Sequence, residues 1–325
     1  MGKMTMVEAI NMAHAWEMDQ DPSVVVLGED VGTNGGVFRA TAGLQQRFGK
    51  ARVQDTPLAE GLIAGAALGM AALGLKPVAE IQFMGFIYPA LDQIASHMAR
   101  LRNRTRGRLT CPLVLRMPHG GGIHAPEHHS ESLETLLCHH PGLRVVCPSS
   151  PARAYGLLLA SIRDPDPVMF LEPVRLYRYA RQEVEDDGRA LAIGECCVLR
   201  AGTDLTIVTW GAMTVDSLKA ADQMTAEGIS CEVIDLSTLA PIDWDTILES
   251  VARTGRLLIV HEAVRTVGLG AEIAACVAER ALYDLEGPIR RVTGYDTVMP
   301  LYRLEHDFIP GVARIVDGIR ATLSD

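Results

Sequence analysis

The sequence predicts an α/β protein with two domains, and three observations support this prediction. Segments with helical periodicity alternate with short Val/Ile/Leu runs along the chain, which is the pattern of parallel strands joined by crossover helices. The 325 residues exceed the usual size of one domain. A polar, Gly-containing stretch interrupts the alternation, so we expect a first domain over residues 1–185, a linker over 186–203 and a second domain over 204–325.

Short apolar runs predict the strands, and longer segments with apolar residues three or four apart predict the helices. In the first domain we expect strands at 24–27, 78–81, 112–116, 143–146 and 168–171, and helices at 5–19, 58–73, 88–104, 133–139 and 151–162. In the second domain we expect strands at 205–209, 231–235, 257–260 and 289–292, and helices at 215–227, 244–253, 270–282 and 312–323.

The amino-acid composition of the chain disfavours several classes of function. The 40 acidic residues outnumber the 30 basic ones, and no Lys/Arg-rich run is present, so nucleic acid is not an expected partner. The seven cysteines form no Cys-x-x-Cys pair, which is typical of a reduced, intracellular protein without a zinc site. The first 20 residues contain no apolar core of a signal peptide, and we expect no export signal.

The stretch DTPLAEGLIAGAALGMAALG at residues 55–74 is a nearly uncharged helix with one carboxylate inside it, Glu60. A membrane span is the alternative, since about 20 apolar residues cross a bilayer. Ala and Gly dominate here in place of Leu and Ile, and Pro57 and Gly74 are ordinary start and stop signals. We therefore favour a buried helix and expect no membrane association.

Three glycines of this helix, Gly61, Gly65 and Gly69, recur every four residues and form one stripe. Each costs about 1 kcal/mol relative to Ala in a helix interior. The stripe indicates close packing against another helix, in the same subunit or across a subunit interface, or the close approach of a ligand.

Glu60 has two interpretations. A carboxylate in the first helical turn is favoured by the helix dipole. With Thr56 as the N-cap and Pro57 as the first helical residue, however, the capping-box position is Ala59. A carboxylate in such apolar surroundings is expected to be desolvated with a raised pKa, which suits an acid or base near neutral pH.

Glu60, Gly65 and Gly69 are similar to the Glu-x4-Gly-x3-Gly pattern in the pyrimidine-binding domain of thiamine-diphosphate enzymes. More closely, the chain resembles over its full length the β subunit of the decarboxylating component of bacterial 2-oxo acid dehydrogenase complexes. The blocks that support this resemblance are VVVLGEDVG (24–32), GGVF (35–38), DTPLAE (55–60), PVAEIQFMGFIYPALDQI (77–94), RMPHGGG (116–122), HHSESLE (128–134), PGLRVVCPSSP (141–151), IRDPDPVMFLEP (162–173) and GISCEVIDLSTLAPID (228–243).

The resemblance implies roles around the cofactor thiamine diphosphate. Glu60 would exchange a proton with a ring nitrogen of the aminopyrimidine and so activate the cofactor. Residues 82–86 follow a predicted strand, at the sheet edge where ligands bind in α/β folds. The resemblance implies that Phe86 packs on the aminopyrimidine, with Leu58 and Gln82 as further contacts; a core position is the alternative for Phe86.

The segment GGGIHAPEHHSESLE is rich in histidine. A metal site formed by His124, Glu127, His128 and His129 is the alternative that the spacing does not favour. The resemblance implies that His129, just before a serine, reaches the active site and assists acyl transfer to the lipoyl group. His128 is the alternative for this position.

The resemblance also implies a potassium ion bound by backbone carbonyls. The matching carbonyls belong to Leu113, Ser161, Asp164 and Asp166. A plain turn at residues 164–167 is the alternative.

Thiamine-diphosphate enzymes hold the diphosphate through magnesium with a Gly-Asp-Gly segment, and this chain contains none. Magnesium needs hard oxygen ligands. We therefore expect a separate α subunit to supply magnesium and the diphosphate half of the site, in an α2β2 heterotetramer with a β–β contact. The resemblance also implies binding to a dihydrolipoyl acyltransferase core and its lipoyl domain.

The expected function is that of the β subunit of a 2-oxo acid dehydrogenase in the bacterial cytoplasm, active only with its α subunit. Pyruvate is favoured because HAPEHHSESLE is similar to the pyruvate type. Branched-chain 2-oxo acids and acetoin are the alternative substrates. A fragment similar to transketolase or deoxyxylulose-phosphate synthase is a second alternative, which the start at MTMVEAI does not favour. A non-catalytic scaffold on the acyltransferase core is the alternative from another class.

Overall fold

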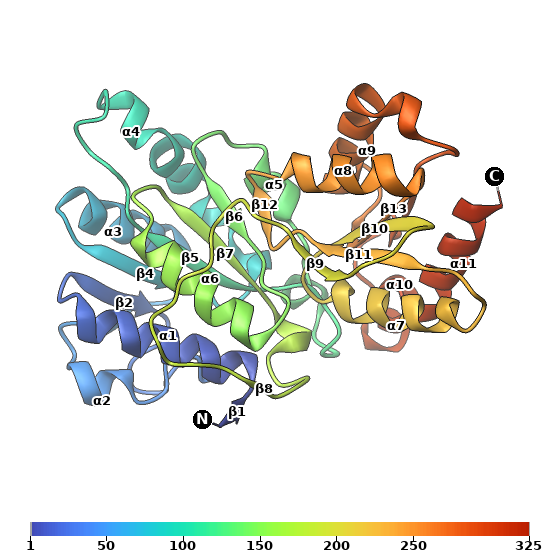
Figure 1. Cartoon of the computed structure of the whole chain (residues 1–325). Helices are drawn as coiled ribbons and strands as arrows, with labels where there is room; N and C mark the ends of the chain where they lie inside the picture. Colours follow the sequence, from blue (N-terminus) through green and yellow to red (C-terminus); the bar gives the residue numbers. More distant parts are fainter. Residues whose placement is uncertain (1, 325) are drawn as a thin grey trace.

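The computed structural model describes residues 2–324, and two sheets organise them (Figure 1). One sheet has seven strands in the order β12-β6-β7-β5-β4-β2-β3, and the other has five in the order β14-β13-β10-β11-β9. The two-stranded pair of β1 (Lys3–Met4) and β8 (Gln182–Glu183) lies beside them. The α/β fold class predicted from the alternation is confirmed.

The seven-stranded sheet is parallel except at one edge, where β12 pairs antiparallel with β6. Its strands are β2 (Val24–Gly28), β3 (Val53–Asp55), β4 (Lys76–Glu80), β5 (Val114–His119), β6 (Arg144–Val146), β7 (Val168–Pro173) and β12 (Thr238–Ala240). Side chains alternate along β7 between two hydrophobic cores. Val168 and Phe170 belong to one core, and Met169 and Leu171 belong to the other. The sheet is therefore buried on both faces, as a parallel sheet requires.

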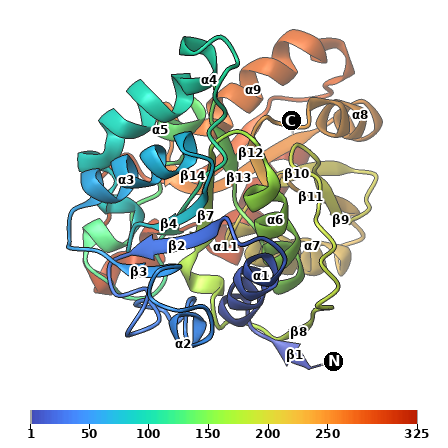
Figure 2. The same cartoon turned by 90° about the vertical axis from the view of Figure 1, so that its left-hand side faces the viewer.

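Helices cover both faces of this sheet (Figure 2). They are α1 (Met6–Gln20), α2 (Leu44–Phe48), α3 (Glu60–Ala72), α4 (Leu101–Arg104), α5 (Glu134–Cys138) and α6 (Pro151–Arg163). Helices α1 and α6 pack together on one face, and α3 lies on the opposite face. The capping box between Thr5 and Glu8 fixes the start of α1.

The five-stranded sheet repeats this layering. Its strands are β9 (Cys197–Arg200), β10 (Leu205–Thr209), β11 (Cys231–Asp235), β13 (Leu257–Val264) and β14 (Arg290–Gly294). Its helices are α7 (Met213–Thr225), α8 (Trp244–Thr254), α9 (Leu269–Arg280), α10 (Glu305–Phe308) and α11 (Val312–Leu323). Helices α7 and α11 contribute to one core, and α8 and α9 to the other.

The predicted strands and most predicted helices are present. The single helix expected over 88–104 is wrong in detail, because this segment consists of 3-10 turns at Tyr88–Ala90 and Met98–Arg100, a π-helix at Asp92–His97, and α4. The predicted domain limits remain a prediction. Strand β9 lies in the expected linker, and β12 of the expected second domain joins the first sheet.

Within residues 2–324, every helix is too short or too polar to cross a membrane.

Candidate active site

Two loops meet at the carboxyl ends of β4 and β5. Residues 82–86 follow β4, and residues 120–133 follow β5. The backbone amide of Leu133 donates to the sulfur of Met84 at 3.4 Å, and a Cβ at Gly85 would overlap the carbonyl oxygen of His128. This edge is where ligands bind in open α/β sheets.

Aromatic rings converge between these loops. The ring of His129 lies 4.4 Å from that of Phe83 and 5.1 Å from that of Phe86, centre to centre, and both pairs are edge-on. Phe38 packs on Phe83 at 5.5 Å. Phe86 remains half-buried, so a flat ligand has access to part of its ring. The structure thus brings together Phe86 and His129, two residues that the resemblance assigns to one site.

The two neighbouring histidines differ in environment. His129 is half-buried, and its Nδ1 is a buried atom without a hydrogen-bond partner among the described residues. His128 is exposed and lies over Phe86 at 6.3 Å between ring centres. An unpartnered buried nitrogen costs free energy, which a ligand or proton acceptor would recover. The geometry favours His129 over His128 as the inward-facing histidine.

Glu60 is the first residue of α3, and Ala59 is its N-cap. The predicted cap at Thr56 with Pro57 as the first helical residue is therefore wrong. The physical reason is β3, which pairs Asp55 with Gly28 of β2, and the amide of Thr56 continues this pairing by donating to the Gly28 carbonyl at 3.0 Å. The chain needs residues 57–59 to turn from strand to helix.

The Glu60 carboxylate makes no hydrogen bond or ion pair with the residues that the structure describes. It is half-buried, so this chain alone does not enclose it in the apolar surroundings expected from the sequence. Burial and then the nearby carboxylates of Asp30 and Glu60 raise the pKa of Glu29. Glu60 therefore lies in an acidic environment at the positive end of a helix.

The glycine stripe brings α3 close to the segment 88–97. A Cβ at Gly61 would lie 3.0 Å from the carbonyl oxygen of Pro89, and one at Gly65 would lie 3.5 Å from the Gln93 amide oxygen. Nothing lies within 4 Å of a Cβ at Gly69. The first two glycines thus fit the packing interpretation, and they hold Glu60 near the turn that carries Phe86.

The other two residues expected at the cofactor are accessible. Leu58 is 71% exposed, ahead of α3. Gln82 is half-buried directly after β4, and its side chain has no hydrogen-bond partner among residues 2–324. Both are free to contact a ligand, and neither is needed for the packing of the fold.

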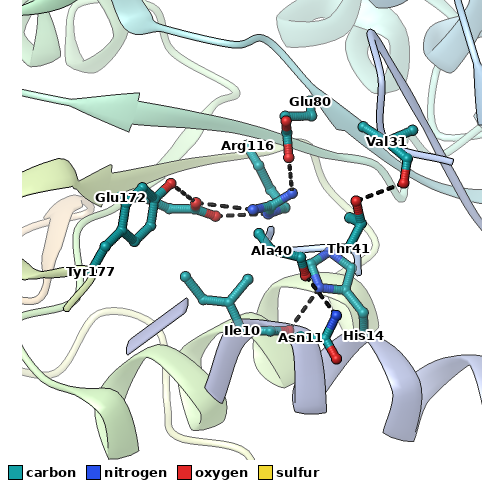
Figure 3. Close-up of polar contacts among 10 residues, drawn as sticks. All are labelled: Ile10, Asn11, His14, Val31, Ala40, Thr41, Glu80, Arg116, Glu172 and Tyr177. Atoms are coloured by element: carbon teal, nitrogen blue, oxygen red, sulfur yellow. Dashed lines mark hydrogen bonds and ion pairs between the residues drawn. The ribbon is translucent and has the colours of Figure 1, made fainter. Parts of the chain in front are cut away.

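A buried ion cluster joins β4, β5 and β7 on the face of the sheet toward α1 (Figure 3). Arg116 of β5 donates two hydrogen bonds to Glu172 of β7, at 2.7 and 2.9 Å, and one to Glu80 of β4 at 2.7 Å. The hydroxyl of Tyr177 donates to Glu172. Burial opposes the charge of Arg116, but Glu172 and Glu80 outweigh it and raise the pKa of the guanidinium. The cluster ties together three neighbouring strands of the sheet, β4, β5 and β7.

This cluster was not predicted, although the sequence contains a signal for it. Glu80 and Glu172 place a charge near the carboxyl ends of β4 and β7, and Arg116 places one in the middle of β5. Charged residues are almost never fully buried unless they are paired. Three such residues on parallel strands indicate an ion cluster on one face of the sheet.

The four residues expected at potassium lie together, where α6 leads into β7 beside the start of β5. The carbonyl of Leu113 accepts from the Val168 amide at 3.0 Å, and that of Ser161 accepts from the Asp164 amide at 3.3 Å. Among the described residues, the carbonyls of Asp164 and Asp166 accept no hydrogen bond. These two free oxygens, and the second lone pairs of the other two, fit a cation held by backbone ligands.

No group of three His, Cys, Asp or Glu side chains within residues 2–324 is placed to hold a metal ion. The site instead combines a free carboxylate, an aromatic face and a histidine at the carboxyl edge of a parallel sheet. Fold and site define a two-domain α/β protein whose site suits a flat, partly apolar ring.

Comparison of the chain with protein families and known proteins supports this description of the fold. The transketolase pyrimidine-binding domain matches residues 2–180, and the transketolase C-terminal domain matches residues 194–315. The pyruvate dehydrogenase E1 component subunit beta of Acholeplasma laidlawii is 52% identical over 98% of both chains. Those of Bacillus subtilis and Staphylococcus epidermidis are each 49% identical over 99% of both chains.

A solved structure, "Split gene transketolase, inactive beta4 tetramer", has a TM-score of 0.82 and 23% identity over 99% of both chains, which supports the fold. The chain belongs to the transketolase family of thiamine-diphosphate proteins and, within it, to the family of pyruvate dehydrogenase E1 β subunits. The resemblance predicted from the sequence motifs is confirmed.

Proposed function

We propose that this chain is the β subunit of a pyruvate dehydrogenase, which with an α subunit decarboxylates pyruvate oxidatively and transfers the acetyl group to lipoyl-lysine. The observation that carries the proposal is the unpaired Glu60 carboxylate at the start of α3, on a helix whose Gly61 lies against the carbonyl of Pro89, three residues after Phe86. His129 in turn lies against the ring of Phe86. The full-length likeness to pyruvate dehydrogenase β subunits favours pyruvate over branched-chain 2-oxo acids or acetoin.

Thiamine diphosphate, when bound, supplies the carbon nucleophile and the electron sink for loss of carbon dioxide. Glu60 would hold the proton that is exchanged with a pyrimidine ring nitrogen. Phe86 would pack against the pyrimidine ring, with Leu58 and Gln82 as further contacts.

His129 serves the second half-reaction. Its buried Nδ1 has no partner within residues 2–324, so it is free to exchange a proton with the sulfur of the lipoyl dithiolane during acyl transfer. Phe83 and Phe86 hold the imidazole on two sides and fix its orientation.

The α subunit supplies magnesium and the diphosphate contacts, because this chain lacks the Gly-Asp-Gly segment with which thiamine-diphosphate enzymes hold that metal. The assembly is an α2β2 heterotetramer with a β–β contact, located in the bacterial cytoplasm on a dihydrolipoyl acyltransferase core. Potassium binds the carbonyls of Leu113, Ser161, Asp164 and Asp166, and stabilises the loop between α6 and β7.

Replacement of Glu60 tests the proposal. In the complex with α, Glu60→Gln is expected to lower the rate of pyruvate decarboxylation by about 100-fold or more, the upper part of the range for a lost acid/base group. Glu272→Gln, a first-turn carboxylate of α9, is the matched control and should keep the wild-type rate. If Glu60 served only the helix dipole, Glu60→Gln would cost at most about 1 kcal/mol of stability and leave decarboxylation unchanged. That result would favour the scaffold alternative.

A further inference from the structure

The second domain holds the loop that carries His129. We call residues 120–133, between β5 and α5, the histidine loop. Glu262 of β13 accepts a hydrogen bond from the amide of Gly121. Glu305, the first residue of α10, accepts from the amide of Gly122 at 2.7 Å and from that of His124 at 3.1 Å. Two carboxylates that are far away in the sequence thus bind three amide donors in the first part of this loop.

These carboxylates are buried, so the contacts are not incidental. Glu305 is 1% exposed and Glu262 is 6% exposed. A buried carboxylate must be compensated by hydrogen bonds or opposite charge. The compensation for Glu305 consists of the loop amides and the imidazole of His124, whose Nε2 lies 3.6 Å from the carboxylate. The loop and Glu305 therefore depend on one another.

The backbone of the loop is shaped for this approach. Gly120 and Gly122 have φ values of +79° and +91°, which favour glycine, and a Cβ at Gly121 would lie 2.6 Å from the terminal methyl of Met299. His124 has a φ of +59°, a conformation that non-glycine residues adopt at a cost. Glu305 accepts from the amide of this same residue, so it stabilises the strained conformation directly.

The far half of the loop has its own supports. At its base, the Nε2 of His119 lies 3.1 Å from a Glu134 carboxylate oxygen, and the Gly120 amide donates to the Glu131 carbonyl at 3.0 Å. The His129 amide donates to the carbonyl of Pro126 at 2.9 Å. His129 lies only five positions after His124 in the chain, so we expect a shift at the Glu305 contact to move the imidazole.

We propose that Glu305, assisted by Glu262, is a positioning residue for acyl transfer: it fixes the histidine loop so that His129 stands between Phe83 and Phe86. This inference rests on the proposed function of His129. It makes the second domain, which carries both glutamates, part of the control of the first domain's site. It also assigns a role to the glycine triplet 120–122, whose amides and conformation serve the contact.

The test measures the two half-reactions separately in the complex with α. Glu305→Ala is expected to slow acetyl transfer to a lipoyl domain about 10- to 100-fold through kcat, with KM for the lipoyl domain and pyruvate decarboxylation with a small-molecule oxidant within about twofold of wild type. Glu305→Gln keeps one acceptor oxygen and should fall between Glu305→Ala and wild type. Asp307→Asn, an exposed carboxylate on the same helix, is the matched control and should not change either rate.

Hydrogen exchange supplies a readout that does not need activity. Peptides from residues 119–133 should exchange faster in Glu305→Ala than in wild type, whereas peptides from α1 should not. Unchanged exchange in the loop would overturn the proposal, as would equal losses in both half-reactions, which would mark Glu305 as general structural support. If Glu305→Ala slowed transfer but His129→Ala did not, the role of the histidine would fall. If the wild-type complex did not decarboxylate pyruvate, the proposed function would be refuted. Hydrogen exchange in the histidine loop would then still test its contact with Glu305.

Discussion

Replacing Arg116 by methionine tests the buried ion cluster most sharply. The substitution conserves much of the side-chain volume and removes the positive charge. It leaves the Glu80 carboxylate without a side-chain partner and Glu172 with only the hydroxyl of Tyr177. Three hydrogen bonds are lost, and all three side chains are at most 7% exposed. Breaking a buried pair from one side costs about 3–5 kcal/mol, so we expect Arg116→Met to lose that much free energy of unfolding at pH 7.5.

The loss should shrink at lower pH, and the sign follows from linkage. Burial already raises the pKa of Glu80, and Arg116 opposes this shift. Without Arg116 the folded-state pKa rises further above its unfolded value of about 4.5, so stability is regained as the pH falls toward that value. We therefore expect a smaller loss at pH 5.5 than at pH 7.5.

The assay is urea denaturation followed by circular dichroism at both pH values. Arg320→Met is the matched control, because Arg320 pairs with Glu227 at the surface, with 54% and 43% of the side chains exposed. An exposed pair contributes at most about 1 kcal/mol. A loss below about 1 kcal/mol for Arg116→Met, or a loss that grows at pH 5.5, would refute the reasoning.

Three further predictions concern single groups. Burial lowers the pKa of His14 to about 3, so below pH 6.5 the unfolded state binds more protons than the folded state. In urea titrations the free energy of unfolding of the wild type should therefore fall by up to about 1.4 kcal/mol per pH unit below pH 6.5, and that of His14→Leu should fall less. Gly69→Ala should raise the free energy of unfolding by up to about 1 kcal/mol, and with it the melting temperature, because the new methyl group meets no other atom. Gly61→Ala should bring no such gain, because its methyl group would crowd the carbonyl oxygen of Pro89. Equal gains would contradict this packing. Burial opposes protonation of His119, but Glu134 outweighs this effect and raises the pKa of His119, while His119 lowers the pKa of Glu134 against the effect of burial. The pair therefore stabilises the folded state most between about pH 4.5 and 6.5. Glu134→Gln should lower the free energy of unfolding more at pH 6 than at pH 8.5, as urea denaturation would measure.

The regular elements were predictable because their signals are local. Helix α1 follows from the spacing of its apolar residues and from the capping box of Thr5 and Glu8. Strands such as β10 and β11 follow from short runs rich in apolar residues, and all five residues of each strand are buried in the structure. Strand β12 was not predicted, because it is three residues long and is defined by its pairing with β6, which lies far earlier in the chain.

The start of α3 shows how tertiary structure overrides a local signal. Thr56 and Pro57 have the composition of a helix start, but the pairing of β3 with β2 keeps the backbone extended through Thr56. As a result, Glu60 occupies the first helical position, where its carboxylate has no capping role and remains free.

The site itself was only partly predictable. Glu60 stood out as a charge in an apolar helix, whereas the roles of His129 and Phe86 came from the family resemblance. The contacts of Glu262 and Glu305 with the histidine loop join residues more than 140 positions apart. No sequence period relates such residues, so the three-dimensional structure was needed to find them.

The central claim is that Glu60 belongs to half of a cofactor site that an α subunit completes. Calorimetric titration of thiamine diphosphate, with magnesium present, tests it directly on this chain alone and on its mixture with the α subunit. We expect tight binding in the mixture and none on the chain alone, because the chain lacks the Gly-Asp-Gly segment that holds magnesium and the diphosphate. Tight binding by the chain alone would contradict the shared site and the requirement for α.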